Sequence, residues 1–230
     1  TRGPTAEIIN KEEEAKGEIS NAGTGQEITS YYITTVSENR QWAIGLLSDI
    51  LINSKFEEQE INKERNVIAE EIKMYQDNPM SGLSSEFLNY IWGESDVGCW
   101  NISGEVDEVL RYKKEDLVNF WNKYYSPERM VVVVAGDLKG DEFDLLEEGF
   151  GSWNATANIC LPIVEPIWAK VNQKTLSRSN EQGHFVVGLP GVKEADICRY
   201  EFKTLDAVLA GSSSSKLFQK LREDLGWAYY

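Results

Sequence analysis

The sequence has 230 residues, of which 41% are hydrophobic and 27% charged, a composition typical of a soluble globular protein with one large domain or two smaller ones. Its formal net charge of -15 would repel a polyanion, so nucleic acid is not an expected partner. No apolar run approaches the length of a membrane span, so no membrane association is expected.

Apolar residues at helical spacing predict most of the secondary structure. Thr5 can cap the first helix and Gly17 ends it, whereas Pro79 disfavours helical backbone at Asn78 and therefore ends the third. In chain order the predicted helices cover residues 4–18, 39–54, 57–76, 81–93, 113–125, 142–153, 199–211 and 213–227.

Runs rich in Val, Ile, Thr and Tyr predict strands between these helices. Residues 18–36 carry glycines in their middle and predict a strand, a turn and a second strand. Residues 129–138 and 184–191 each predict one more strand, the first of them buried, while residues 94–109 are expected to form a loop. This mixture indicates an α+β or α/β fold rather than a regular βαβ alternation.

The weakest pattern of the chain lies at residues 154–172, which contain two prolines and little periodicity. We therefore predict a first domain at residues 1–157, a linker at 158–168 and a second domain at 169–230. The sequence has no signal-peptide core at its start, and both of its ends look truncated. Three widely spaced cysteines, Cys99, Cys160 and Cys198, form no disulfide framework, which favours a reducing, cytoplasmic setting.

Two glutamates on the third predicted helix are the first candidates for chemistry. Glu64 and Glu71 are seven residues apart, so they lie on nearly the same helical face, and at least one is expected to point inward beside Val67 and Ile68. Three interpretations stay open: solvated or ion-paired surface carboxylates, a general acid/base pair, and a metal ligand with a supporting carboxylate. Spacing alone does not make a zinc site, because His184 is the only histidine and is expected to be a strand-edge or core residue.

Four stretches, in this order, resemble the M16 family of zinc metallopeptidases, which includes pitrilysin, insulinase and the mitochondrial processing peptidase. They are GEISNAGTGQEITSYYITTV, FEEQEINKERNVIAEEIKMYQDNP, YYSPERMVVVVAGDL and GSSSSKLFQKLREDLGWAY, and together they extend over nearly the whole chain. The resemblance implies a two-layer α+β fold, with a mostly antiparallel sheet and helices packed on one face.

The resemblance also implies roles for individual residues. Glu71 matches the zinc-ligand glutamate of the family, and Glu64 matches a second glutamate that supports the metal site. Arg222 and Tyr229 match a pair that contacts substrate, in which the guanidinium and the phenol hydroxyl could bind carbonyl oxygens near the scissile bond. The edge strand that would pair with the backbone of the substrate contains Asn21, Ala22, Gly23 and Thr24.

The His-x-x-Glu-His motif of the family is absent from these 230 residues, although it supplies two zinc ligands and the general base. From motif spacing we expect it to lie just ahead of Thr1, so that the chain would be a fragment with one of three zinc ligands. The resemblance thus implies a zinc-dependent metalloendopeptidase for the intact protein, acting on extended peptides or unfolded segments, and we expect this chain alone to be inactive. The alternative is a non-catalytic M16-like subunit or scaffold, and either could form a homo- or heterodimer with another M16-type chain. A bacterial source is expected, although an organellar one would show the same features.

Overall fold

The computed structural model of the protein describes residues 5–92, 101–156, 173–179 and 182–228. The chain divides into two compact units, Thr1–His184 and Phe185–Tyr230, and each unit is described by itself. Within the described ranges, no helix is both long and apolar enough to cross a membrane.

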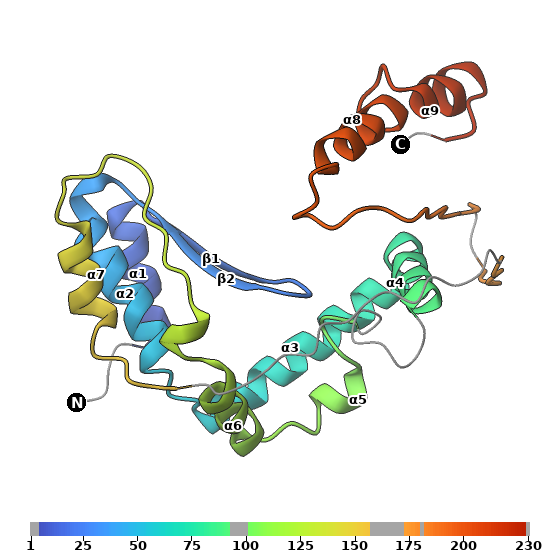
Figure 1. Ribbon diagram of the computed structural model, residues 1–230. Coiled ribbons are helices and arrows are strands. Elements are labelled where there is room, and N and C mark those ends of the chain that lie inside the picture. Colours follow the sequence, from blue (N-terminus) through green and yellow to red (C-terminus); the bar gives the residue numbers. More distant parts are fainter. Residues whose placement is uncertain (1–4, 93–100, 157–172, 180–181, 229–230) are drawn as a thin grey trace. The chain divides into compact units, whose positions relative to one another are not determined.

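The first unit begins with a helix and a hairpin (Figure 1). Helix α1 (Ala6–Lys16) ends at Gly17, whose φ of 65° places it in the left-handed region that glycine adopts without strain. Strand β1 (Ile19–Thr24) then pairs antiparallel with β2 (Thr29–Thr34), as the sequence predicts. Thr5 occupies the N-cap position of α1, but its side chain makes no capping hydrogen bond.

The hairpin register fixes which backbone groups point outward. The N–H of Gly25 donates to the carbonyl of Ile28 across the turn at 2.8 Å. Hydrogen-bonded and non-hydrogen-bonded pairs alternate along an antiparallel ladder, so Gly23–Ser30, Asn21–Tyr32 and Ile19–Thr34 exchange hydrogen bonds. The backbone groups of the remaining residues therefore point away from the partner strand; these are Ser20, Ala22 and Thr24 on β1 and Thr29, Tyr31 and Ile33 on β2.

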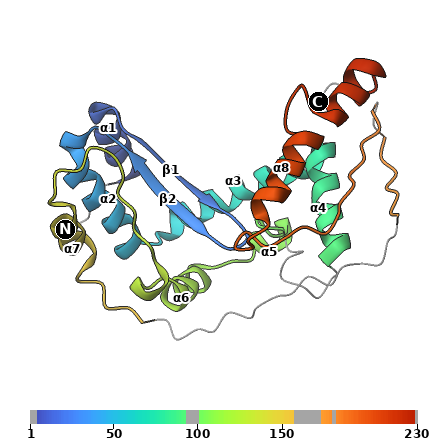
Figure 2. The same cartoon turned by 45° about the horizontal axis from the view of Figure 1, so that its top comes forward.

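Helices follow the hairpin in the predicted order. Their bounds are η1 (Ser37–Asn39), α2 (Arg40–Ile52), α3 (Glu58–Asp77), α4 (Pro79–Trp92), α5 (Val106–Val109), α6 (Lys114–Tyr124), η3 (Pro127–Arg129) and α7 (Glu142–Phe150). Helices α1, α2 and α7 gather at the open end of the hairpin, and α3 and α4 extend away from that cluster (Figures 1 and 2). Helix α2 packs against α7, and α3 packs against α4 and α5.

The break between α3 and α4 follows from proline, as predicted. Asn78 has extended backbone (φ -74°, ψ 117°), because Pro79 excludes helical geometry from the residue before it. The Oδ1 atom of Asn78 accepts hydrogen bonds from the N–H groups of Met80 (3.0 Å) and Ser81 (3.2 Å). Asn78 thus caps α4, and Pro79 starts that helix at its first position.

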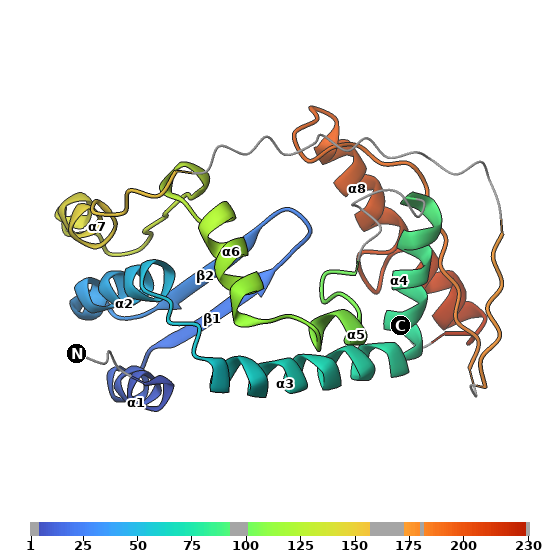
Figure 3. The same cartoon turned by 90° about the horizontal axis from the view of Figure 1, so that it is seen from below.

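Aromatic residues connect α6 to the start of α3 and to the hairpin. The indole of Trp121 stacks on that of Trp153 with centroids 6.3 Å apart, meets Phe56 edge-on at 6.2 Å, and donates to the carbonyl of Leu51 at 3.1 Å. Helix α6 lies across the near side of the hairpin in Figure 3, and the hydroxyls of Tyr31 and Tyr125 are 3.0 Å apart. Burial, together with that hydrogen bond, raises the pKa of Tyr31.

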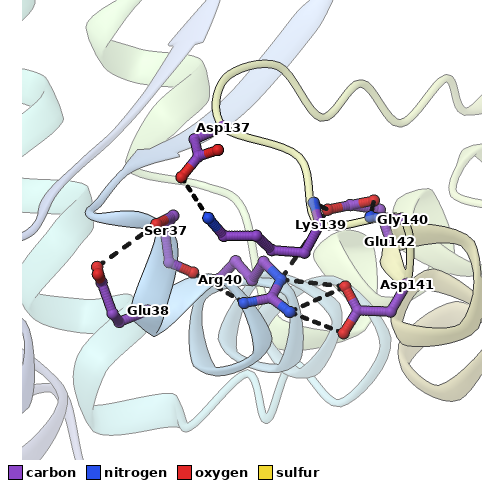
Figure 4. A network of polar contacts seen from close by, with 8 residues as sticks. All are labelled: Ser37, Glu38, Arg40, Asp137, Lys139, Gly140, Asp141 and Glu142. Atoms are coloured by element: carbon purple, nitrogen blue, oxygen red, sulfur yellow. Dashed lines mark hydrogen bonds and ion pairs between the residues drawn. The ribbon is translucent and has the colours of Figure 1, made fainter.

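An ion pair joins α2 to the start of α7, across 101 residues of sequence (Figure 4). Arg40 holds Asp141 through both carboxylate oxygens, with Nη2 2.7 Å from Oδ2 and 2.9 Å from Oδ1. The Arg40 guanidinium lowers the pKa of Asp141 below its usual value. The buried carboxylate of Glu142 accepts the N–H groups of Lys139 and Gly140, and these hydrogen bonds lower its pKa as well.

Three expectations from the sequence are wrong in the described residues. Residues 129–138 form no paired strand and are not buried, since Val131 is 87% and Val133 78% exposed. Residues 184–191 form no strand either, so His184 is a half-buried residue outside any sheet. The expected loop at 94–109 contains α5, a single helical turn that packs Val109 against α3.

The second unit is helical in its described part. Helix α8 (Arg199–Leu209) follows Cys198, an exposed cysteine outside any disulfide, and α9 (Lys216–Phe218) continues into a π-helical turn at Gln219–Asp224. Ser215 occupies the N-cap position of α9, yet its buried hydroxyl makes no hydrogen bond. Cys99 and Cys160 lie outside the described residues.

Candidate functional site

A large open hollow of about 1770 Å³ in the first unit contains most of the candidate site residues. One wall is the length of α3, and another is the outer part of β1 near the hairpin turn. The residues that line it include Ala22, Gly23, Thr24, Glu64, Ile68, Glu71, Tyr75, Asn89 and Arg178. The structure therefore brings together the helix and the strand that the sequence singled out separately.

Helix α3 positions the two glutamates through its buried side chains, of which Ile61 and Ile72 also border the hollow. Ile61, Ala69 and Ile72 are buried, with Ile72 only 1% exposed, and they fix the rotation of the helix about its axis. Glu64 and Glu71 are exposed and line the hollow. The expectation that at least one of them points into the protein interior is therefore wrong.

Neither glutamate has an ion-pair or hydrogen-bond partner within the part of the chain that the structure describes. The three nearby cations are engaged elsewhere. Lys63 pairs with Glu60 at 2.7 Å and Lys73 with Glu70 at 2.7 Å. Arg65 donates to the carbonyl of Tyr112 at 2.6 Å and to Asn62. The interpretation of Glu64 and Glu71 as surface carboxylates paired with Lys63, Arg65 or Lys73 is thus excluded. Both carboxylates face the hollow, and no cationic side chain of the described residues pairs with them.

The outer edge of β1 forms the strand wall of the hollow. Ala22 and Thr24 point their backbone N–H and C=O groups away from β2, and both residues line the hollow. The N–H of Ala22 is hydrogen-bonded to Oδ1 of Asn21 at 2.8 Å, which satisfies one donor of this edge. An edge strand with exposed backbone groups can pair with an added extended peptide.

Arg178 is a lining residue that sequence reasoning missed. Its Nη1 donates to the carbonyl of Gln76 near the end of α3 at 3.0 Å. A Cβ placed on Gly82 would lie 3.1 Å from the same nitrogen, so the glycine leaves room for the guanidinium. No sequence signal pointed to Arg178, because the segment around it has no periodic pattern.

Two candidate residues lie in the second unit. Arg222 is in the π-helical turn, where its guanidinium lies 4.8 Å from the Phe218 ring centroid and 3.7 Å from Glu223. Tyr229 lies outside the described residues. The roles implied for both remain predictions.

The metal-binding capacity of these residues is limited. Glu71 offers an exposed, unpaired carboxylate of the type that zinc accepts. Among the described residues, no three His, Cys, Asp or Glu side chains are grouped so that they could hold a metal ion. Glu71 can therefore supply one zinc ligand, but the described residues do not form a complete zinc site.

Comparison with protein families gives two matches that together cover most of the chain. A family model described as "Insulinase (Peptidase family M16)" matches residues 1–96, and one described as "Peptidase M16 inactive domain" matches residues 111–230. Similar curated proteins include the uncharacterized zinc protease YmxG of Bacillus subtilis, 33% identical over 91% of this chain and 50% of that protein. An uncharacterized zinc protease of Mycobacterium leprae is 33% identical over 98% of this chain and 51% of that protein. The chain thus spans about half the length of the curated relatives it matches.

Solved structures show the same fold. A protease from Helicobacter pylori superposes with a TM-score of 0.80 at 24% identity, over 98% of this chain and 56% of that one. A peptidase M16 inactive domain from Pseudomonas fluorescens gives a TM-score of 0.81 at 16% identity, over 97% of this chain and 55% of that one. The first half of the periplasmic protease PqqL from Escherichia coli gives 0.59 at 21% identity, over 67% and 35%. These likenesses confirm the predicted α+β fold.

Proposed function

Because the chain belongs to peptidase family M16, we propose that the whole protein is a zinc-dependent metalloendopeptidase that cleaves extended peptides or unfolded segments. The observation that carries this proposal is the hollow of the first unit, in which two unpaired carboxylates of α3 and the open edge of β1 line one space. The curated relatives are named zinc proteases, which supports both the metal and the reaction class.

Glu71 is the proposed zinc ligand of this chain. It is exposed to the hollow and has no competing cation among the described residues, so its carboxylate is available to a metal. Zinc, when bound, would polarise the scissile carbonyl and lower the pKa of a bound water. Two further ligands must come from residues other than those described, as the family resemblance implies for its His-x-x-Glu-His motif.

Glu64 is proposed to support the site from one side of Glu71. The two carboxylates are seven residues apart on a regular helix, about two turns, so Glu64 is set too far along the axis to share every contact of Glu71. Its unpaired oxygens can accept hydrogen bonds from ligating groups and hold their orientation. We therefore expect the loss of Glu64 to weaken zinc binding less than the loss of Glu71.

The β1 edge is the proposed substrate platform. A peptide added beside Asn21–Thr24 would exchange backbone hydrogen bonds with Thr24 and with Ala22, where it would replace the Oδ1 atom of Asn21 as the acceptor of the Ala22 N–H. Backbone pairing is indifferent to most side chains but requires an extended conformation, which a folded substrate cannot adopt without local unfolding. Arg222 and Tyr229 are proposed to bind substrate carbonyl oxygens from the second half of the molecule.

We also propose a cytoplasmic location and assembly with another M16-type chain. One solved relative is named a periplasmic protease, so fractionation of cells is needed to decide the compartment. The second candidate function is a non-catalytic M16 subunit. It is favoured by the match of residues 111–230 to a model described as an inactive domain.

The test uses the full-length protein and measures bound zinc by mass spectrometry and peptide hydrolysis with an unfolded protein substrate. Glu71→Gln should sharply reduce both, whereas Glu70→Gln is the matched control. Glu70 is the adjacent exposed carboxylate, and it is paired with Lys73 rather than free to bind a metal. If Glu71→Gln retains zinc and activity, the ligand assignment fails. If the unmodified protein holds no zinc and cleaves nothing, the non-catalytic subunit is the better conclusion.

A further inference from the structure

The hollow of the first unit differs in chemistry between its two ends. Near the start of α3 its lining includes the apolar residues Phe56, Ile61 and Leu117. Near the end of α3 one face of α4 supplies small and polar residues instead, namely Ser81, Gly82, Ser85, Glu86 and Asn89. Arg178 lines the hollow beside that face, because its guanidinium lies against Gly82. Together with Arg178, these residues of α4 form what we call the α4 end of the hollow.

The α4 end carries an unbalanced positive charge. The carboxylate that α4 contributes, that of Glu86, is paired with Lys174 at 2.9 Å. Arg178 donates through Nη1 to the backbone carbonyl of Gln76 at 3.0 Å, and this neutral acceptor leaves the charge of the guanidinium unbalanced. Among the described residues, no carboxylate forms an ion pair with Arg178. Since a guanidinium has five N–H donors, Arg178 retains donors for a ligand in the hollow.

The position of Arg178 relative to Glu71 follows from the geometry of α3. Gln76, which accepts the hydrogen bond of Arg178, follows Glu71 by five positions, a rise of about 7.5 Å along the helix. With the hydrogen bond added, the guanidinium is about 10 Å along the helix from Glu71. An extended peptide advances about 3.3 Å per residue, so this separation corresponds to about three residues. A side chain within three residues of a scissile bond at Glu71 can therefore reach Arg178.

The middle of the hollow is unsuited to a carboxylate of the substrate. Glu64 and Glu71 face it without a cationic partner among the described residues. Like charges repel one another more strongly in a partly enclosed space than in bulk water. An acidic side chain of a bound peptide is therefore disfavoured beside these two glutamates and favoured at the α4 end.

We propose that the α4 end is a specificity subsite for an acidic side chain of the substrate, and that Arg178 is the residue that selects it. The inference rests on the proposed function, because it concerns the same hollow. A guanidinium donates two parallel N–H bonds to the carboxylate of Asp or Glu, and the hydroxyls of Ser81 and Ser85 on the same face of α4 can add further donors. Backbone pairing along β1 does not distinguish side chains, so this contact sets a preference that the strand edge cannot.

The test compares the cleavage of matched peptides by the purified full-length protein. Each acetylated and amidated peptide carries a single Asp, Asn or Lys at one of the three positions on either side of the scissile bond, so that the Asp side chain is the only carboxylate. At one of these positions, kcat/KM should be about two- to fivefold higher for Asp than for Asn, the range of an exposed ion pair. Arg178→Gln should bring this ratio to about 1, and Arg178→Glu should make Lys preferred over Asp at the same position. Lys73→Gln is the matched control, because it removes one positive charge from α3 outside the hollow and should leave the ratio unchanged.

The ratio separates a loss of selection from a loss of structure. Both rates are measured on the same sample, so partial unfolding of a variant lowers them equally. Equal cleavage of the Asp and Asn peptides at every position, or a preference that persists in Arg178→Gln and Arg178→Glu, overturns the subsite while the peptidase stands. If the unmodified protein cleaves none of the peptides, the proposed function itself is contradicted, and the subsite falls with it.

Discussion

Replacing Ile72 by alanine tests whether the buried side of α3 sets the position of both glutamates. Ile72 is 1% exposed, so its whole side chain is removed from water in the folded protein. Ile72→Ala deletes three methylene-sized groups, which at about 0.8 kcal/mol each lowers the free energy of unfolding by about 2.5 kcal/mol. The cavity left behind adds to this loss, so we expect a total of about 3 to 4 kcal/mol. Ile72→Val removes one such group and should cost about 1 kcal/mol.

Urea denaturation followed by far-UV circular dichroism measures these differences. Val67→Ala is the matched control, because Val67 lies on the same helix but is 58% exposed. Alanine also has the higher helix propensity, so this change should alter stability by less than about 0.5 kcal/mol. If Ile72→Ala costs no more than Val67→Ala, α3 is not anchored by Ile72, and the argument for the orientation of Glu64 and Glu71 fails.

Three further predictions follow from single contacts. Arg40 lowers the pKa of Asp141 in the folded state, so this pair stabilises the protein above the ordinary carboxyl pKa of 3.8, and the contribution is lost as the pH falls below it. Asp141→Asn should remove this acid-sensitive part, seen as a flatter dependence of the urea midpoint on pH between about pH 2 and 5; an unchanged slope would contradict the prediction. Gly17→Ala should lower the free energy of unfolding by about 1 to 2 kcal/mol. The cause is the positive φ of 65° alone, because no heavy atom lies within 4 Å of an added Cβ. Gly45→Ala is the control, because Gly45 has helical backbone and equal space around an added Cβ, and it should not destabilise the protein. Glu64→Gln in the full-length protein should weaken zinc binding by about 10- to 100-fold, measured by chelator competition, and unchanged affinity would exclude a supporting role.

Local signals in the sequence predicted most of the described elements. Pro79 ended α3 as expected because its ring acts on the residue directly before it, and Gly17 ended α1 because only glycine adopts positive φ at little cost. The hairpin was predictable for the same reason, since turn and strands are adjacent in sequence. In each case the residues that decide the structure are within a few positions of one another.

The valine-rich segment at residues 131–134 shows that a local pattern does not predict burial. Four consecutive valines predict an extended, buried strand, but burial depends on a partner that is distant in sequence. In the described residues that partner is absent, and Val131 and Val133 face solvent. The short helix α5 was missed for the opposite reason. Its single turn is too short to show periodicity, and packing against α3 stabilises it.

The sequence contains enough information to predict that Glu64 and Glu71 are unpaired, although Lys63, Arg65 and Lys73 lie close to them along the chain. Side chains on a helix meet at spacings of three and four, whereas neighbours one or two positions apart point in different directions. Lys63 and Arg65 flank Glu64 by one position, and Lys73 follows Glu71 by two, so none of these cations is placed to pair with them.

The residues that do lie three or four positions from the two glutamates carry no positive charge; they are Glu60, Ile61, Val67, Ile68, Met74 and Tyr75. The glutamates that find lysines are those at the correct spacing, since Glu60 reaches Lys63 and Glu70 reaches Lys73, each across three positions. Glu60 and Glu70 are therefore engaged with lysines, whereas Glu64 and Glu71 line the hollow without a partner among the described residues. This difference is the physical reason to look for the metal near Glu64 and Glu71 rather than at Glu60 or Glu70, and the family resemblance favours Glu71 as the ligand.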